Sequence, residues 1–532
     1  MPAQAGIQSD LWIPACAGMT TKILSDFLVS IASGGDNSRM SSNTAYSRLE
    51  GRFTKLSHLD QASGFLHWDM SAVMPEGGAE SRGEQLATLS SLSHDLLVAP
   101  EVKDWLDAAE DEKLDDWQSA NLQEMRRDWL HASAVPGPLV EAISRAGSAC
   151  EMVWRKARPA ADFALVVEPL SKLLGLTREV AEIKSQALGV SPYDALLDQY
   201  EPGGRSADIE RIFADLAEFL PGFTQEVLKK QGPAPAAPEG PFPQATQKAI
   251  GVEMMQTLGF DFDHGRLDES LHPFCGGTPD DVRITTRYDT EDFITSLFGV
   301  IHETGHALYE QGLPKDWRHQ PVGRARGMSV HESQSLLMEM QACRSRAFFR
   351  FAAPKLAEKF GRSDWQADAL YDATMRVEPG FIRVDADEVT YPAHVILRFR
   401  LEQALIAGDL KIADLPAAWN EGMEKLLGIV PPDDRLGCLQ DIHWYDGAFG
   451  YFPTYTLGAM TAAQLFDAAA RTLPDLEGDI AAGNFAPLLG WLRANVHGKA
   501  SRLPTDELLR QATGKPLDAA IFKAHLRRRY LS

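Results

Sequence analysis

The stretch Phe293-Ile-Thr-Ser-Leu-Phe-Gly-Val-Ile-His302-Glu303-Thr-Gly-His306-Ala-Leu-Tyr-Glu-Gln-Gly312 places two histidines four residues apart in an amphipathic helical pattern. Residues i and i+4 lie on the same face of a helix, so His302 and His306 can share one metal ion. Glu303 is offset by about 100° and therefore flanks the ion rather than binding it. That position suits a general base for metal-bound water, and the pattern indicates a zinc-peptidase helix.

A third ligand must come from another helix. Glu310 continues the i, i+4, i+8 series, but a helix rises about 12 Å over eight residues, which excludes it as a ligand of the same ion. Glu332 is the favoured ligand, because it lies at the start of a second helix that we expect to run to about Phe351. The alternative is a capping box from Ser329 to Glu332, in which the glutamate bonds backbone N–H groups instead.

Composition restricts the class of protein. The chain has 532 residues, of which 44% are hydrophobic and 24% charged, as in ordinary globular proteins, and a formal net charge of −22. That charge argues against nucleic acid as a partner. There is no apolar run of about 18 residues, so we expect no membrane contact. The odd set of five cysteines without a CxxC pair indicates no disulfide framework and favours the cytoplasm.

Turn signals divide the chain into four parts. Residues 1–39 lack sustained helical periodicity and are expected to be a disordered extension before a natural start at Met40. Residues 40–230 are predicted to form an N-terminal helical lobe, 231–243 a Pro-rich connector, and 244–532 a helical lobe carrying the metal site. The helices predicted in the first lobe are Thr44–Trp68, Ala79–Leu97, Val102–His131 and Pro138–Gln186. At the other end of the chain, Lys523–Arg529 is interpreted as a solvated helix face.

One strand is predicted, from Asp281 to Tyr288, because this segment alternates and is rich in β-branched residues. It makes a small β element next to the HExxH helix. Its free edge could pair with an extended peptide by strand addition, and the alternative is a hairpin packed on the core. Arg283 on this strand could bind the C-terminal carboxylate of such a peptide and is the second candidate for that role, after Arg383.

The chain resembles the carboxypeptidase Taq family of zinc metallocarboxypeptidases from about Ala45 to Leu531. Trp68-Asp69-Met70 is similar to that family's N-terminal block, whereas residues 1–39 have no counterpart. The further blocks typical of the family occur in order: His272-Pro-Phe274, Asp281-Val-Arg283-Ile-Thr285, His302-Glu-Thr-Gly-His306, His331-Glu-Ser-Gln334, Ile382-Arg383-Val-Asp-Ala-Asp387 and Gly437-Cys-Leu-Gln440-Asp441-Ile-His443-Trp444.

This resemblance implies a mainly α, multi-helix metallopeptidase fold with a deep central groove, and a homodimer. It implies removal of single residues from peptide C-termini, with Glu303 as the catalytic residue. It also implies a zinc ion, or cobalt in its place, held by His302, His306 and Glu332.

Further site residues follow from similarity to this family and to related helical metallopeptidases. His443 and Tyr455 are candidates for stabilising the oxyanion, with a structural histidine and a core tyrosine as alternatives. Arg383 is the first candidate for the terminal carboxylate, which a planar guanidinium binds bidentately, and the alternative is a surface arginine. Asp441 is expected either to orient an imidazole or to cap a turn.

The function predicted is a zinc-dependent carboxypeptidase acting on peptides, in which Glu303 takes a proton from water as it attacks the scissile carbonyl. One alternative is a zinc endo-oligopeptidase of similar helical build. Another is a non-catalytic helical peptide-binding protein. The intact HExxH motif argues against the last, because binding alone requires no base beside the metal.

Overall fold

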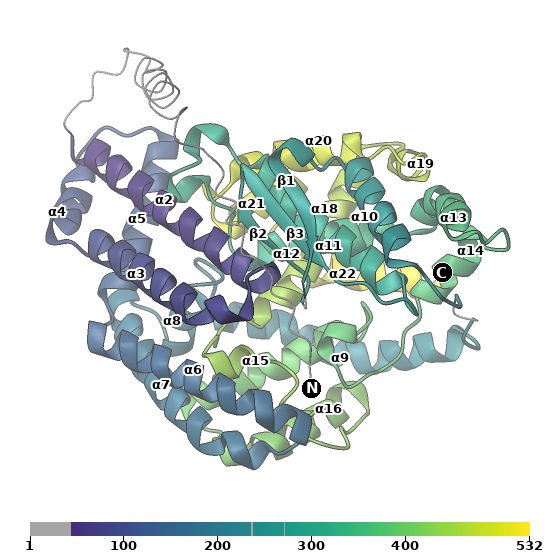
Figure 1. Ribbon diagram of the computed structural model, residues 1–532, viewed down its shortest axis with the longest axis horizontal. Coiled ribbons are helices and arrows are strands. Elements are labelled where there is room, and N and C mark those ends of the chain that lie inside the picture. The colour runs from purple at the N-terminus through teal and green to yellow at the C-terminus, as the bar shows by residue number, and fades with distance from the viewer. Residues whose placement is uncertain (1–43, 236–237, 271) are drawn as a thin grey trace, which may run out of the picture.

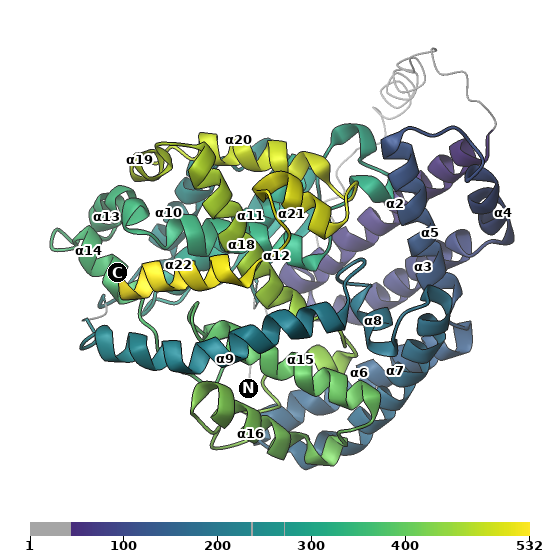
Figure 2. The ribbon, with the colours of Figure 1, turned by 180° about the vertical axis from the view of Figure 1, so that it is seen from behind.

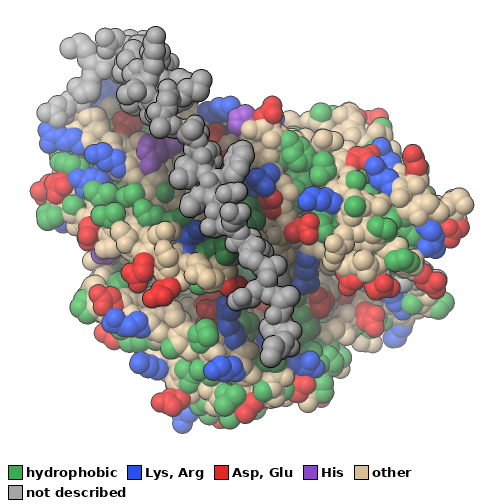
Figure 3. Space-filling model, in the orientation of Figure 1, with side chains coloured by type: hydrophobic (Ala, Val, Ile, Leu, Met, Phe, Trp, Pro, Cys, Tyr) green, Lys and Arg blue, Asp and Glu red, His purple; other side chains and the backbone are tan. Residues whose placement is uncertain are grey.

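The computed structural model describes residues 44–235, 238–270 and 272–532, so the prediction for residues 1–39 lies outside it. The described chain is mainly α-helical with one small sheet beside the HExxH helix (Figure 1), which confirms the predicted fold class. None of the helices in these ranges combines the length and the apolar run that crossing a bilayer requires. Acidic and basic side chains are interspersed over the face shown in Figure 3.

The first lobe begins with four helices around a small core of its own. They are α2 (Ala45–Ala72), α3 (Ala79–Leu97), α4 (Pro100–Ala109) and α5 (Asp116–Ser133). The single helix predicted over Val102–His131 is wrong. Asp115 starts a new helix there with a capping box, accepting from the Gln118 backbone N–H at 2.9 Å and donating its own N–H to the Gln118 side chain at 3.1 Å.

Four further helices complete the lobe: α6 (Gly137–Ala160), α7 (Val167–Leu188), α8 (Pro192–Leu197) and α9 (Ser206–Lys230). The long helix predicted over Pro138–Gln186 is interrupted because Ala161 takes a left-handed conformation with φ 52°. Side chains of α6 to α9 share one core with α15 (Tyr391–Ala407), α16 (Leu415–Leu427), α18 (Pro453–Thr472) and α22 (Ala519–Leu531). The connector predicted at residues 231–243 therefore does not separate two hydrophobic cores, because helices before and after it share this one.

The second large core surrounds the HExxH helix. It contains α10 (Gln244–Leu258), α11 (Ile294–Gly312), α12 (Met328–Leu336), the π-helix Leu337–Cys343 and α13 (Arg346–Phe360). The continuous helix predicted to Phe351 is wrong, because Arg344 leaves helical geometry with ψ 53° and Ser345 caps the next helix. The remaining helices are α14 (Ala367–Thr374), α17 (His443–Asp446), α19 (Leu476–Ala481), α20 (Ala486–Asn495) and α21 (Thr505–Thr513).

The sheet has three strands, in the order β1 (Gly265–Glu269), β3 (Asp281–Thr286) and β2 (Phe274–Thr278). β1 is parallel to β3, with Gly265 opposite Val282, and β2 is antiparallel, with Phe274 opposite Thr285. β3 is thus the central strand and the prediction that its edge is free is wrong. Gly277 lies near the end of β2 with φ 86°, where a Cβ would lie 2.1 Å from the Asp281 carbonyl oxygen, so the close pairing with β3 requires glycine.

Candidate metal centre and substrate cavity

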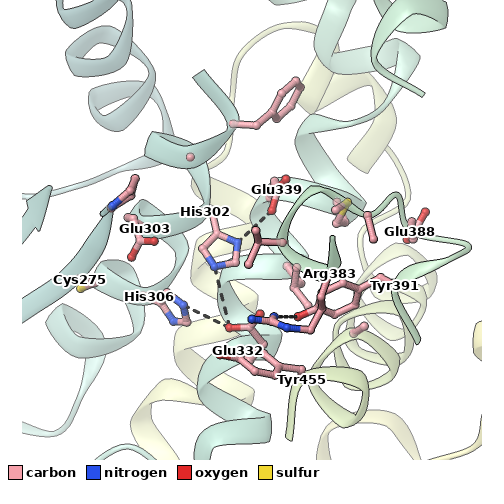
Figure 4. A pocket seen from close by; sticks show the side chains of 18 of the residues that line it. Cys275, His302, Glu303, His306, Glu332, Glu339, Arg383, Glu388, Tyr391 and Tyr455 are labelled. Atoms are coloured by element: carbon pink, nitrogen blue, oxygen red, sulfur yellow. Dashed lines mark hydrogen bonds and ion pairs between the residues drawn. The ribbon is translucent and has the colours of Figure 1, made fainter. Parts of the chain in front are cut away.

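A cavity of about 840 Å³ lies between α11, α12, the π-helix, α18 and the loop that precedes α15. Figure 4 shows the side chains of the metal site on one wall and those of Arg383, Tyr391 and Tyr455 beyond them. Phe274 and Cys275 of β2 line the same cavity. An edge strand is therefore next to this space, although it is β2 and not the predicted β3.

The structure brings His302, His306 and Glu332 together, with their donor atoms within 4.8 Å of one another. Glu332 Oε2 lies 3.4 Å from His306 Nε2 and 3.9 Å from His302 Nε2 (Figure 4). α12 begins at Met328 after Gly327, so Ser329 is inside the helix and the capping-box alternative is wrong. Glu332 is free to point across to α11.

These three donors fit a zinc ion in chemistry and in spacing. Two imidazole nitrogens and one carboxylate oxygen are a ligand set that zinc takes in hydrolases. Donors placed about 2.0–2.1 Å from one tetrahedral ion lie about 3.3–3.4 Å apart. The observed separations of 3.4 and 3.9 Å are close to that value.

His302 is oriented by a buried carboxylate. Its Nδ1 lies 2.9 Å from Glu339 Oε2, and Arg344 donates to Glu339 Oε1 from Nε at 3.1 Å and from Nη2 at 3.0 Å. This leaves Nε2 of His302 directed towards Glu332. Glu339 was not predicted, because the π-helix that carries it cannot be recognised from hydrophobic periodicity.

His306 is oriented through a second imidazole. Its Nδ1 lies 2.6 Å from His331 Nδ1, and His331 Nε2 lies 2.9 Å from Glu310 Oε1. With Nε2 of His306 facing the other donors, its Nδ1–H donates to His331, whose own Nε2–H donates to Glu310. Glu310 therefore supports His306 from behind the metal site. Both Glu310 and His331 could have been recognised from the sequence, because Glu310 lies four residues after His306 on one helix face and His331 directly precedes Glu332.

Two glycines allow the helices of the site to approach closely. A Cβ at position 305 would lie 2.4 Å from the Gln334 carbonyl oxygen, and one at position 458 would lie 2.8 Å from the Glu332 side chain. Gly305 lets α12 approach α11, and Gly458 of α18 accommodates Glu332 from the other side. Glu332 is thereby placed within reach of both histidines.

The electrostatics of this site indicate an excess of negative charge. Burial lowers the pKa of His302, but the hydrogen bond that the ring donates to Glu339 and the charges of Glu332 and Glu303 outweigh it and raise that pKa to about 10. Burial raises the pKa of Glu303 to about 7, with the neighbouring Glu332 adding to the shift and His302 opposing it. Burial lowers the pKa of His306 to about 4, which keeps this ring neutral and able to bind a metal. A divalent cation would offset the clustered acids.

Arg383 lies on the cavity wall in a group of fixed charges. Its Nε and Nη2 donate to Asp441 Oδ1 at 3.1 and 2.9 Å, while Nη1 lies 3.5 Å from the Tyr391 hydroxyl. The fully buried Arg398 pairs with the other oxygen of Asp441 at 2.6 Å. Two guanidinium groups thus share one carboxylate, and one positive charge is left over beside the cavity. Asp441 therefore orients two arginines, instead of orienting an imidazole or capping a turn as the sequence suggested.

Tyr455 lines the cavity and His443 lies behind it, with His443 Nε2 3.2 Å from the Tyr455 hydroxyl. Burial raises the pKa of Tyr455 to about 12, so its hydroxyl stays protonated as a donor. Burial also lowers the pKa of His443 to about 4, which leaves that ring uncharged at neutral pH. Tyr391 and Tyr451 also line the cavity and were not predicted.

Arg283 is placed differently. Its guanidinium stacks over Phe65 at 4.7 Å and Trp68 at 4.6 Å, and it pairs with Asp281 at 2.7 Å. It is not among the described residues that line the cavity. In this structure it ties the sheet to α2.

Comparison with known proteins agrees with this geometry. The sequence model of the carboxypeptidase Taq (M32) metallopeptidase family matches residues 48–530. Thermostable carboxypeptidase 1 of Thermus thermophilus is 39% identical over 505 residues, which cover 92% of this chain and 99% of that protein. Carboxypeptidase 1 of Bacillus subtilis is 34% identical, with 90% and 96% covered.

Solved structures show the same fold. Metallocarboxypeptidase 1 of Trypanosoma cruzi superimposes with a TM-score of 0.90 at 42% identity, covering 92% of this chain and 99% of that chain. The M32 carboxypeptidase of Deinococcus radiodurans R1 gives a TM-score of 0.87 at 35% identity, covering 91% and 98%. A helical fold with this cavity and donor set defines a metallopeptidase. The chain belongs to the carboxypeptidase Taq (M32) family and is a metallocarboxypeptidase, a peptide hydrolase.

Proposed function

We propose that this protein is a zinc-dependent carboxypeptidase that releases single amino acids from the C-termini of peptides. The observation that carries the proposal is the position of His302, His306 and Glu332 in one cavity with the unpaired positive charge of the Arg383 group. Family membership supports it, because the relatives are named carboxypeptidases.

His302, His306 and Glu332 would hold the metal, with zinc favoured by the mixed nitrogen and oxygen donors and cobalt as an alternative. Such an ion would supply a Lewis acid that polarises the scissile carbonyl and lowers the pKa of a bound water towards about 7. Glu339 and the His331–Glu310 pair keep the two imidazoles in the required tautomer.

Glu303 would act as the general base and then the general acid. Its side chain is buried beside His302 on α11 and lines the cavity, so it can take a proton from the attacking water and pass it to the leaving amine. The Tyr455 hydroxyl, backed by His443, would donate to the oxyanion as negative charge develops on the substrate oxygen.

Arg383 would bind the terminal carboxylate of the substrate. Its Nη1 is turned from Asp441 towards Tyr391 at the cavity wall, so donor capacity remains for a ligand. The charge left over from Arg383, Asp441 and Arg398 favours an anion at this place. Arg283 stays a weaker candidate, because it stacks against α2.

The first test removes the base. Glu303→Gln should retain the metal at one ion per chain but lose turnover on a blocked dipeptide, as judged by metal analysis and release of free amino acid. We expect a loss of about 10²-fold or more, the scale of general-base catalysis. Near-normal turnover in the metal-loaded variant would exclude Glu303 as the base.

The second test concerns the substrate carboxylate. The unaltered protein should cleave a free-acid peptide and barely act on the same peptide with an amidated C-terminus. Arg383→Met should lower kcat/KM for the free acid by about 10- to 100-fold, because a hydrogen bond to a charged group contributes about 1.5–3 kcal/mol. It should change the slow reaction of the amide much less. The ratio of kcat/KM for the free acid to that for the amide therefore distinguishes the loss of a carboxylate-binding group from general damage to the active site.

The same assay decides between the proposal and a zinc endo-oligopeptidase of similar helical build. An endo-oligopeptidase would cut the amidated peptide at internal bonds and release fragments instead of single residues. A non-catalytic peptide-binding protein would release nothing with either substrate.

We also propose that the protein is a cytoplasmic homodimer. The dimer rests on similarity to the family, and sedimentation of the purified protein tests it. The compartment is supported by Cys150, Cys275, Cys343 and Cys438, which form no disulfides within the described residues. Fractionation of cells that produce the protein tests the compartment.

A further inference from the structure

The carboxylate of Glu388 lies buried at the junction of three segments that are distant in the sequence. His525 Nε2 lies 2.8 Å from Glu388 Oε1, and Arg529 Nη1 donates to Oε2 at 2.9 Å. Gln341 Nε2 donates to Oε1 at 2.9 Å and the Tyr530 hydroxyl to Oε2 at 3.2 Å. Burial raises the pKa of Glu388, but the charges of Arg529 and His525 outweigh it and hold that pKa well below its usual range.

Each of the three segments has a distinct position. Glu388 lies near the end of the loop that carries Arg383, and both residues line the substrate cavity. Gln341 belongs to the π-helix that carries Glu339, the partner of His302. His525, Arg529 and Tyr530 lie on α22, which packs against α18 and α9 on the face shown in Figure 2.

Arg529 also binds the π-helix directly. It donates from Nη1 to the Met340 carbonyl oxygen at 2.6 Å and from Nη2 to that of Gln341 at 3.4 Å. These carbonyls directly follow Glu339. A single guanidinium therefore joins the backbone of the π-helix behind the metal site to the carboxylate of Glu388 in the loop of Arg383. The basic end of the chain, interpreted from the sequence as a solvated helix face, is exposed at Arg527 and Arg528, whereas the side chain of Arg529 is only 10% exposed.

We propose that Arg529, His525 and Glu388 form a clamp that fixes the distance between the metal-binding helices and the loop of Arg383. The three are positioning residues, since they act through Glu339 and Arg383. This inference rests on the proposed function, in which the substrate is held at one end by Arg383 and reacts at the other beside His302 and His306.

Loss of the clamp should slow the reaction because the two ends of a short substrate are held by different segments of the chain. If the loop moves relative to the π-helix, the terminal carboxylate still binds but the scissile carbonyl is displaced. A misplacement of about 1 Å can cost about 10²-fold in rate. The loss should therefore appear in kcat more than in KM.

The test compares three single variants at full metal occupancy and well below their unfolding temperatures. Arg529→Met keeps the length of the side chain but removes its donors, and Arg529→Lys restores one charge. Lys523→Met is the matched control, because Lys523 lies on the same helix and pairs with Asp215 of α9 at 2.7 Å, away from the cavity. Each is measured for kcat, KM and amide hydrogen exchange of residues 337–344 and 383–390.

We expect Arg529→Met to lower kcat by about 10- to 100-fold with little change in KM, and to speed exchange in both segments. Arg529→Lys should recover part of kcat, and Lys523→Met should resemble the unaltered protein in kcat and exchange. A kcat of Arg529→Met within twofold of the unaltered protein, or an equal loss in Lys523→Met, would overturn the clamp.

If Arg529→Met does not fold, Glu388→Gln tests the same clamp with a smaller change in shape. Here too a kcat within twofold of the unaltered protein would refute it. Exchange is measured on metal-free protein as well, so it tests the clamp without turnover. An unaltered protein that releases no amino acid in the presence of zinc would instead refute the proposed function.

Discussion

At the scale of single residues, the two histidines of HExxH are held in different ways. His302 contacts the carboxylate of Glu339 directly, whereas His306 reaches Glu310 only through the ring of His331. A carboxylate behind a metal-binding imidazole fixes its tautomer and raises its basicity. His306 receives this support through a second ring that has to be correctly protonated itself.

We predict that His331→Ala lowers the affinity for zinc by about 10- to 100-fold, the usual cost of losing such a partner. Competition with a coloured chelator measures this affinity directly. His264→Ala is the control, because His264 makes an exposed pair with Asp261 at 2.7 Å and has no role in the cavity. An unchanged affinity in His331→Ala would show that His306 needs no such support.

At the scale of secondary-structure elements, Gly305 decides how closely α11 and α12 pack. A Cβ at this position would clash with backbone atoms of Gln334 and Ser335, which cannot move away as a flexible side chain could. Gly299 lies in the same helix, yet a Cβ there would meet no atom within 4 Å among the described residues.

The two glycines therefore predict stability changes of opposite sign. Gly305→Ala should destabilise the protein by about 1–3 kcal/mol through overpacking and should weaken metal binding as Glu332 shifts. Gly299→Ala should stabilise it by about 0.5–1 kcal/mol, because alanine favours the helix. Urea unfolding of the metal-free variants measures both values. Equal changes would contradict the close approach of the two helices.

Sequence reasoning succeeded where local chemistry determines structure. The i, i+4 spacing placed His302 and His306 on one face of a helix, and helix geometry excluded Glu310 as a third ligand. It failed where tertiary contacts decide. The π-helix that carries Glu339 leaves no recognisable hydrophobic period, and β1 and β2 are too short and rich in glycine or charge to stand out. Arg529 pairs with Glu388, which is 141 residues away in the sequence.

At the scale of the whole molecule, buried carboxylates join segments that are far apart in the chain. Asp198 pairs with Arg127 and His131, and Asp441 pairs with Arg383 and Arg398. Burial would raise the pKa of each of these two carboxyls, but the partner groups outweigh it and hold both values well below the usual range. Glu388, which is paired with His525 and Arg529 of α22, follows the same rule.

These carboxylates predict a loss of stability in acid. A group whose pKa is depressed in the folded state contributes stability above its unfolded pKa, which is about 3.9 for aspartate and about 4.3 for glutamate. That contribution should be lost as the pH falls below about 4. Unfolding by urea at several pH values should show this loss. Asp198→Asn should be less stable than the unaltered protein at pH 7 but should lose less on acidification, and an identical slope would contradict the assignment.

The orientation of both imidazoles by neighbours within the protein has a consequence for the choice of ion. Their rings are directed at a common point by Glu339 and His331, so little rearrangement should accompany the arrival of an ion. The protein would then discriminate between ions by the coordination geometry that each prefers. A fixed set of donors at tetrahedral spacing favours zinc over copper, which prefers a square-planar set, and leaves the choice between zinc and cobalt to the supply in the cell.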